Sequence, residues 1–174
     1  MAYRRPKNLR DFLVRAKIKP LSSTAPAAPK ISRCNDGRCK TCDYIASDKT
    51  EYTFHNTGEK RFIPHNLSCS SENLIYMINC KRCLNDSSAP SQYIGQTCRS
   101  LRERFGEHRR GIINKLDDSV PNHFNQPNHS LNDVEVIPLI QIHNNRDSIR
   151  LAMEQHLIEK ADSLRHGLNR TSDH

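Results

Sequence analysis

Short apolar runs alternate with polar loops along the second half of the chain. Residues 73–79 (NLIYMIN) and 92–95 (QYIG) are typical of strands, and the turn-rich stretch between them would join them as a hairpin with a long loop. Residues 134–142 (VEVIPLIQI) form a third run, in which Pro138 indicates a sheet edge or a β-bulge. The pattern therefore predicts three strands.

Two amphipathic helices are predicted around these strands. The first begins near Ser100, which forms a capping-box pattern with Glu103. Its apolar face would contain Leu101, Phe105, His108, Ile112 and Leu116. The second covers residues 147–162, with Asp147 as its cap. Its stripe would contain Ile149, Met153, Leu157 and Ala161. Residues 117–130, which contain two prolines, are predicted to be a loop.

The order of these elements predicts an α+β domain over residues 70–170, a three-stranded antiparallel sheet flanked by helices. Residues 34–69 form a cysteine-bearing segment with weak strand signals near 52–54 and 61–64. Residues 1–33 read as a basic tail, with a short amphipathic helix followed by a linker rich in Pro, Ala and Ser.

Composition changes this picture in two ways. Hydrophobic residues make up 35% of the chain and Trp is absent, so the modest core needs a further source of stability, such as a bound metal. The net charge is +8, and residues 1–33 hold nine Lys or Arg against one Asp. Such a tail suits attraction to phosphate backbones, or is simply a solvated extension. No apolar run approaches a membrane span, and we expect no membrane partner.

Seven cysteines without a secretion signal favour a reducing, intracellular compartment, where clustered cysteines bind metal more often than they form disulfides. Cys80-x2-Cys83 and His123-x5-His129 can together close a tetrahedral Zn²⁺ site that clips two loops together.

A second zinc site is predicted upstream. The cluster that supplies three thiolates is Cys34, Cys39 and Cys42. Cys69 is the natural fourth ligand, and His55 and His65 are alternatives. Cys98 is left over and is expected to be a half-buried apolar residue.

A candidate catalytic group surrounds the first helix. Arg104 and His108 are four residues apart and share a face, close in sequence to Tyr93. An Arg can grip phosphate, and a Tyr or His nearby can take a proton from an attacking water. Alternatively, the helix only binds DNA backbone. The further arginines expected to contact DNA are Arg99, Arg102, Arg109 and Arg110.

The chain resembles the GIY-YIG nuclease superfamily. LIY (74–76) and YIG (93–95) resemble its signature pair, with Leu74 in place of the first Gly, and YIGQTCRSLRERFGEH matches its second strand and first helix. The resemblance implies that Arg104 is the catalytic arginine. The other implied site residues are Tyr76, Tyr93, His108, Glu154 as the metal ligand, and Asn169. The residue pattern alone, without the resemblance, favours an exposed helical position for Glu154.

The resemblance is closer to the endonuclease domain of Penelope-like retroelements. That branch has a Cys pair between the signature strands, a His pair after the first helix, an upstream Cys cluster and a segment like NLRD (8–11). The chain contains no Tyr-x-Asp-Asp motif, so it is expected to be a piece without reverse transcriptase. Element RNA or a separately supplied reverse transcriptase would then be further partners.

The resemblance implies a DNA endonuclease that hydrolyses phosphodiesters with one Mg²⁺ or Mn²⁺, nicks one strand during retroelement integration and works in the nucleus. Tyr76, assisted by His108, would activate water, while Tyr93 would order the metal's waters or the phosphate. Two other classes remain open: a catalytically silent, zinc-stabilised nucleic-acid-binding module, and a zinc-dependent adaptor. Nicking distinguishes the nuclease from the module, and salt-dependent DNA affinity distinguishes both from the adaptor.

Overall fold

A computed structural model describes residues 28–86, 89–143 and 146–170. The helix predicted near residues 8–16 lies outside these residues. The described elements are, in chain order, β1 (Ile31–Ser32), η1 (Lys40–Asp43), β2 (Glu51–Thr53), β3 (Lys60–Phe62), β4 (Leu67–Ser68), β5 (Leu74–Cys80), η2 (Cys83–Asn85), β6 (Gln92–Thr97), α2 (Leu101–Ile113), α3 (Ser119–Phe124), η3 (Leu131–Asp133), β7 (Val134–Gln141) and α4 (Asp147–Ala161).

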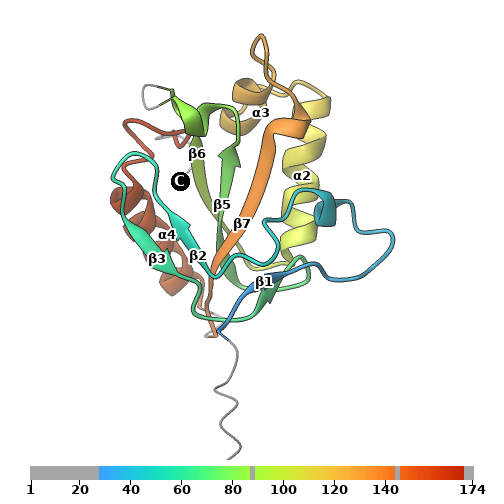
Figure 1. Ribbon diagram of the computed structural model, residues 1–174, viewed down its shortest axis with the longest axis vertical. Coiled ribbons are helices and arrows are strands. Elements are labelled where there is room, and N and C mark those ends of the chain that lie inside the picture. The colour runs from blue at the N-terminus through green and yellow to red at the C-terminus, as the bar shows by residue number, and fades with distance from the viewer. Residues whose placement is uncertain (1–27, 87–88, 144–145, 171–174) are drawn as a thin grey trace, which may run out of the picture.

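The centre of the fold is an antiparallel three-stranded sheet in the order β6-β5-β7 (Figure 1). Every residue of β5 is buried, because this middle strand has neighbours on both edges and layers on both faces. Tyr76 in β5 lies opposite Gly95 in β6 and Pro138 in β7. The register shifts beside this point, and β7 is an edge strand, so both expectations for the proline are confirmed.

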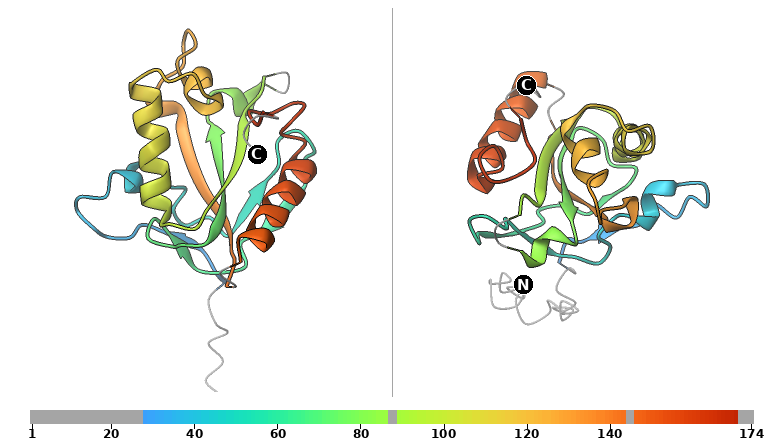
Figure 2. Two further views of the ribbon diagram at one scale, coloured as in Figure 1. Left: turned by 180° about the vertical axis from the view of Figure 1, so that it is seen from behind. Right: turned by 90° about the horizontal axis from the view of Figure 1, so that it is seen from above.

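Helices α2 and α4 stand on either side of the sheet, with α4 beside β6 (Figure 2). The start of α2 is as predicted: Ser100 donates from its backbone N and its Oγ to the Glu103 carboxylate, at 3.2 and 2.7 Å. Its predicted apolar face is buried as far as Ile112. Leu116 lies beyond the helix and is 54% exposed, so its assignment to that face was wrong. No helix among the described residues has the length and apolarity to cross a membrane.

Helix α3 lies in the stretch that was predicted to be a loop. The Asp118 side chain accepts from the backbone N of Ser119, and Pro121 occupies the first turn, where its missing N–H breaks no helical bond. A Cβ on Gly111 of α2 would lie 3.0 Å from Pro121 Cγ, so the glycine lets these two helices approach closely. The prolines therefore shape a short helix here instead of preventing one.

Helix α4 has nearly the predicted bounds but a different orientation. Its N-cap is Arg146, and Asp147 is the first helical residue, whose carboxylate accepts from Arg150 at 2.6 Å. The buried residues are Arg150, Glu154, Leu157, Ile158 and Ala161. Ile149 is 37% exposed, so the predicted apolar stripe was displaced by about one residue around the helix.

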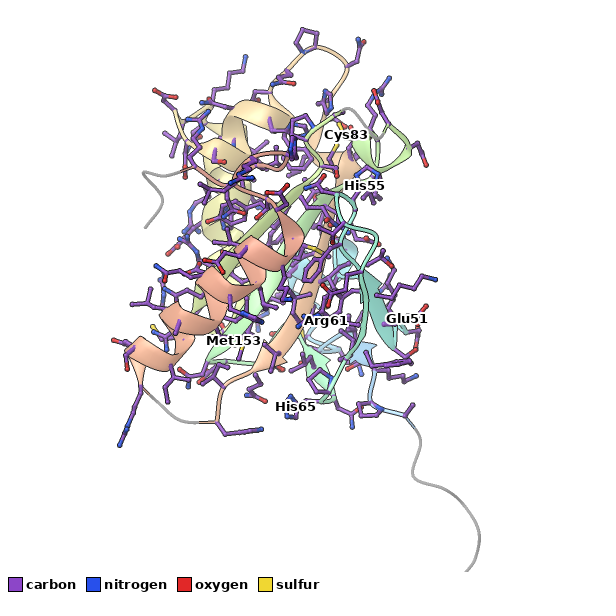
Figure 3. All side chains as sticks on the ribbon, turned by 90° about the vertical axis from the view of Figure 1, so that its left-hand side faces the viewer. Glu51, His55, Arg61, His65, Cys83 and Met153 are labelled. Carbon is purple, nitrogen blue, oxygen red and sulfur yellow. The ribbon has the colours of Figure 1, made fainter. Side chains whose placement is uncertain are left out.

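The cysteine-rich segment runs around the sheet and reaches both helices, α4 through the β2–β3 hairpin and α2 through η1 (Figures 1 and 2). The β2–β3 hairpin lies beside α4, as Figure 3 shows with Arg61 and Met153 labelled. Asn56 in its turn donates to the Ala161 carbonyl of α4 at 3.0 Å. At the other side, the backbone N of Arg102 donates to the Cys69 carbonyl at 2.8 Å. This bond satisfies an otherwise unpaired N–H at the start of α2.

Candidate active site

Tyr76, Arg104 and His108 form a hydrogen-bonded group between β5 and α2. Arg104 Nε donates to the Tyr76 hydroxyl at 3.0 Å, and that oxygen lies 2.8 Å from His108 Nε2. The ring of Tyr93 in β6 contacts His108 edge-on, with centroids 5.5 Å apart. Tyr76 is completely buried, while the Arg104 side chain is 33% exposed. A phosphate in solution could therefore reach the guanidinium while the phenol stays fixed beneath it.

Burial determines the protonation of this group. Burial, together with the smaller effect of the Arg104 charge, lowers the pKa of His108 to about 4, so the imidazole is neutral at neutral pH. Burial also raises the pKa of Tyr76 well above its usual range. The Tyr76 hydroxyl accepts from Arg104, so its own proton can go to an unprotonated His108 Nε2. The resting site contains a phenol and a neutral imidazole.

Gly95 allows the two tyrosines to meet. A Cβ at this position would lie 2.7 Å from Tyr76 Oη and 2.8 Å from a ring carbon of Tyr93. No side chain fits in that space, which explains why glycine follows the Tyr-Ile pair of β6. Close packing around the glycine places both rings against His108.

Glu154 comes to the site from α4 and is only 6% exposed. The exposed position favoured by the residue pattern was therefore wrong. A backbone hydrogen bond from Gln96 and the charges of Arg104 and Arg150 favour its carboxylate, but burial dominates and raises its pKa to about 7. A buried carboxylate beside a solvent-reachable arginine suits a hard divalent cation, whose charge would hold it ionised.

Arg150 and Asn169 brace the site from behind. Arg150 is buried and donates to the side chains of Gln96 and Asp147. Asn169 accepts from the backbone N of Ile94 at 2.9 Å and donates to its carbonyl at 2.7 Å. These contacts tie the C-terminal segment to β6, next to Tyr93. Asn169 therefore lies beside the site with its amide directed at backbone.

Glu107 is a site residue that the residue pattern did not single out. Its carboxylate accepts from Arg104 at 2.9 Å and from Arg99 at 2.6 Å. The i, i+3 spacing from Arg104 was the available signal. Arg104 is thus held on two sides, by Tyr76 through Nε and by Glu107 through Nη1.

Cys80, Cys83, His123 and His129 come together at one end of the sheet, with their ligand atoms within 4.8 Å of one another. Cys83 Sγ lies 3.1 Å from His129 Nε2 and 3.7 Å from His123 Nε2, separations that a tetrahedral Zn²⁺ would bridge. His129 Nδ1 lies 3.2 Å from the Pro127 carbonyl, a contact that leaves Nε2 for a metal. The set fits zinc.

Four thiols gather in the upstream segment. The parallel pairing of β1 with β4 brings Cys69 beside the cluster, and Cys42 Sγ lies 3.5 Å from both Cys34 and Cys69. Cys39 completes the set. His55 and His65, the alternatives, lie elsewhere: His55 contacts Ser91, and His65 contacts His143. Burial raises the pKa of Cys69, and a bound cation would reverse this by favouring the thiolate. Cys98, expected to be half-buried, is exposed.

The four arginines expected to contact DNA do not form one surface. Arg99 is paired with Glu107, and Arg102 is paired with Asp36 at 3.2 Å. Arg109 and Arg110 lie with Arg102 on the side of α2 that faces the cysteine-rich segment. Within the described part of the chain, Arg109 and Arg110 make no ion pair.

Comparison with known proteins agrees with this geometry. A family model described as the GIY-YIG catalytic domain matches residues 72–169, more than half of the 174 residues. No curated protein and no solved structure matches the chain. The matched stretch contains the sheet, α2 and α4, and hence Tyr76, Arg104 and Glu154. The chain therefore belongs to the GIY-YIG family, a family of nucleases that act on nucleic acid with a divalent metal.

Proposed function

We propose that this protein is a metal-dependent DNA endonuclease that nicks one strand by hydrolysing a phosphodiester bond. One observation supports the proposal above the rest: the buried Tyr76 hydroxyl joins Arg104 to His108, and the buried Glu154 carboxylate lies near the same arginine. This arrangement offers a phosphate grip, a proton route and a cation ligand in one place.

Arg104 binds the scissile phosphate and stabilises the charge that develops on it. Its exposed edge is free to approach an anion, and its guanidinium stays charged at any working pH. Glu154 would hold Mg²⁺ or Mn²⁺, which when bound supplies Lewis-acid stabilisation of the phosphate and the leaving oxygen.

Tyr76 and His108 form the proton route. Because the pKa of Tyr76 is raised by burial, a resting phenolate does not exist to act as a base. The phenol takes the proton of the attacking water as it passes its own to the neutral His108 Nε2, 2.8 Å away. Tyr93 packs on the imidazole and Asn169 fixes the β6 backbone, so both act as positioning residues in this scheme.

We extend the proposal to the biological role. One set of these residues in the described part of the chain suits a nick, as in integration by a Penelope-like retroelement, and action on chromosomal DNA would take place in the nucleus. Support comes from the four-cysteine cluster and the Cys/His cluster, which the fold gathers from the segments where the resemblance to such elements has them.

Nicking of a supercoiled plasmid tests the enzymatic proposal. The parent should convert it to open circles with Mg²⁺ or Mn²⁺ and stop when chelator removes them. Glu154→Gln should lower the rate about 10²-fold or more. Glu159→Gln, a matched change at an exposed position of the same helix, should leave it unchanged. No conversion by folded, zinc-loaded parent would refute the nuclease and favour the silent binding module.

A further inference from the structure

A cavity of about 410 Å³ lies between the cysteine-rich segment and α2, away from Glu154 and Tyr76. Two cations of the cysteine-rich segment line it, Arg38 and Lys40, and α2 contributes three more. The full set of charged side chains around it is Asp36, Arg38, Lys40, Arg102, Glu103, Arg109 and Arg110. Five cations against two carboxylates give the cavity a positive field. We refer to it as the basic cleft.

Both carboxylates of the basic cleft are already occupied. Asp36 pairs with Arg102, and Glu103 is held in the capping box of α2 by Ser100. No ion pair or side-chain hydrogen bond within the described part of the chain engages the other four cations, Arg38, Lys40, Arg109 and Arg110. Four like charges at one cavity repel one another unless an anion lies among them. The cleft is therefore suited to a ligand with several negative charges.

The position of the cleft relative to the active site suggests which ligand. Arg104 and His108 project from α2 toward β5, whereas Arg102 and Arg109 project toward the cysteine-rich segment. A helix with its side chains is about 10–12 Å across, roughly the width of the major groove. A duplex with one phosphate at Arg104 would therefore bring further backbone phosphates within reach of the cleft.

We propose that the basic cleft binds the phosphate backbone of the duplex, beyond the scissile group, and so makes the zinc-binding segment part of the nucleic-acid interface. The inference deepens the proposed function and rests on it for the choice of ligand. It also separates the arginines on and just before α2 by role, because Arg99 and Arg104 pair with Glu107 on the active-site side and the cleft arginines do not.

The cysteine-rich segment is braced well enough to serve this role. Tyr44, which follows η1, packs against Phe105 of α2 in a tilted arrangement with ring centroids 5.2 Å apart. Arg38 and Lys40 lie between the zinc ligands Cys34 and Cys42, so the four-thiol site determines where their backbone runs. The cleft thus combines a rigid frame with long cationic side chains, as a non-specific backbone contact needs.

The test measures affinity of the zinc-loaded full chain for a fluorescent duplex as a function of salt, by anisotropy and without Mg²⁺. The cleft variant is Arg38→Ala with Lys40→Ala. The matched control is Lys60→Ala with Lys160→Ala, which removes two exposed cations outside the cleft. Removing one cation that neutralises a phosphate should lower the slope of log K against log salt by about 0.9 and weaken binding at 0.1 M salt by roughly 8-fold.

We expect the slope of log K against log salt to be lower by about 1 to 2 for the cleft variant, and its affinity to be at least about 10-fold weaker. The control should keep nearly the slope and affinity of the parent. Equal losses in both variants, or no loss in the cleft variant, would overturn the proposal. Loss of binding to poly-glutamate but not to duplex would overturn it in favour of an acidic protein ligand. Nicking by the parent is measured separately. If the parent nicks DNA and the cleft variant binds DNA as tightly as the parent, only the proposal about the cleft is refuted. A parent that binds through the cleft but never nicks refutes the nuclease alone.

Discussion

Replacing His108 with Gln should make the protein less sensitive to acid. His108 is buried against Tyr76, and burial lowers its pKa to about 4 from the 6.5 that it has in an unfolded chain. Below pH 6.5 this residue is protonated in the unfolded chain but stays neutral in the folded chain until the pH approaches 4. Stability from the neutral imidazole is therefore complete above pH 6.5 and is lost as the pH falls from 6.5 toward 4.

The size of the effect follows from the two pKa values. At pH 7 the difference between them contributes roughly 0.2 kcal/mol in favour of unfolding, and at pH 5 it contributes about 2 kcal/mol. Gln cannot titrate, yet its side-chain oxygen can still accept the hydrogen bond from Tyr76. The parent should therefore lose about 2 kcal/mol more unfolding free energy than His108→Gln between pH 7 and pH 5.

Urea unfolding of both proteins at pH 7 and pH 5, in zinc-containing buffer without Mg²⁺, measures this difference. Zinc release and carboxylate protonation affect both proteins alike, so only the difference between the two pH profiles counts. Parallel profiles, differing by less than about 0.5 kcal/mol, would refute the buried neutral imidazole and with it the proposed proton acceptor.

Three further substitutions test other parts of the structure. Gly95→Ala would place a Cβ 2.7 Å from Tyr76 Oη, so it should destabilise the fold by about 2 kcal/mol and slow nicking, as denaturation and plasmid assays would reveal. Glu107→Gln removes a charged contact of the proposed catalytic arginine and should slow nicking roughly 10-fold with unfolding free energy unchanged; an unaltered rate would show that this contact is dispensable. Cys42→Ser should remove about one zinc per chain by elemental analysis, whereas exposed Cys98→Ser should remove none; equal zinc contents would contradict the four-thiol site.

Local signals in the sequence predicted the elements that depend on local interactions. The capping box of Ser100 and Glu103 is a contact within one turn, so its pattern located the start of α2 directly. The apolar runs of β5 and β7 and the proline at a sheet edge are likewise readable from a few residues. The spacing of Cys80, Cys83, His123 and His129 predicted a group that the fold does bring together, because closely spaced pairs are common in zinc sites.

Long-range contacts decided what the sequence left open. Pairing of β1 with β4 brings Cys69, and neither histidine, to the upstream thiols. The buried face of α4 contains Arg150 and Glu154, which an apolar-stripe argument assigns to solvent. Gln96 in β6, far away in sequence, compensates the burial of these two charges. Its side chain accepts a hydrogen bond from Arg150, and its backbone N–H donates one to Glu154. No local pattern contains that compensation, so the helix orientation could not be read correctly.

The proposed mechanism depends above all on Arg104 acting on the scissile phosphate. The most direct test is the single-turnover nicking rate of Arg104→Ala at saturating protein, with folding checked by circular dichroism and zinc content. We predict a rate at least about 10²-fold below the parent, with the fold intact. A rate comparable to the parent would show that the group built on Tyr76, Arg104 and His108 is not the catalytic centre.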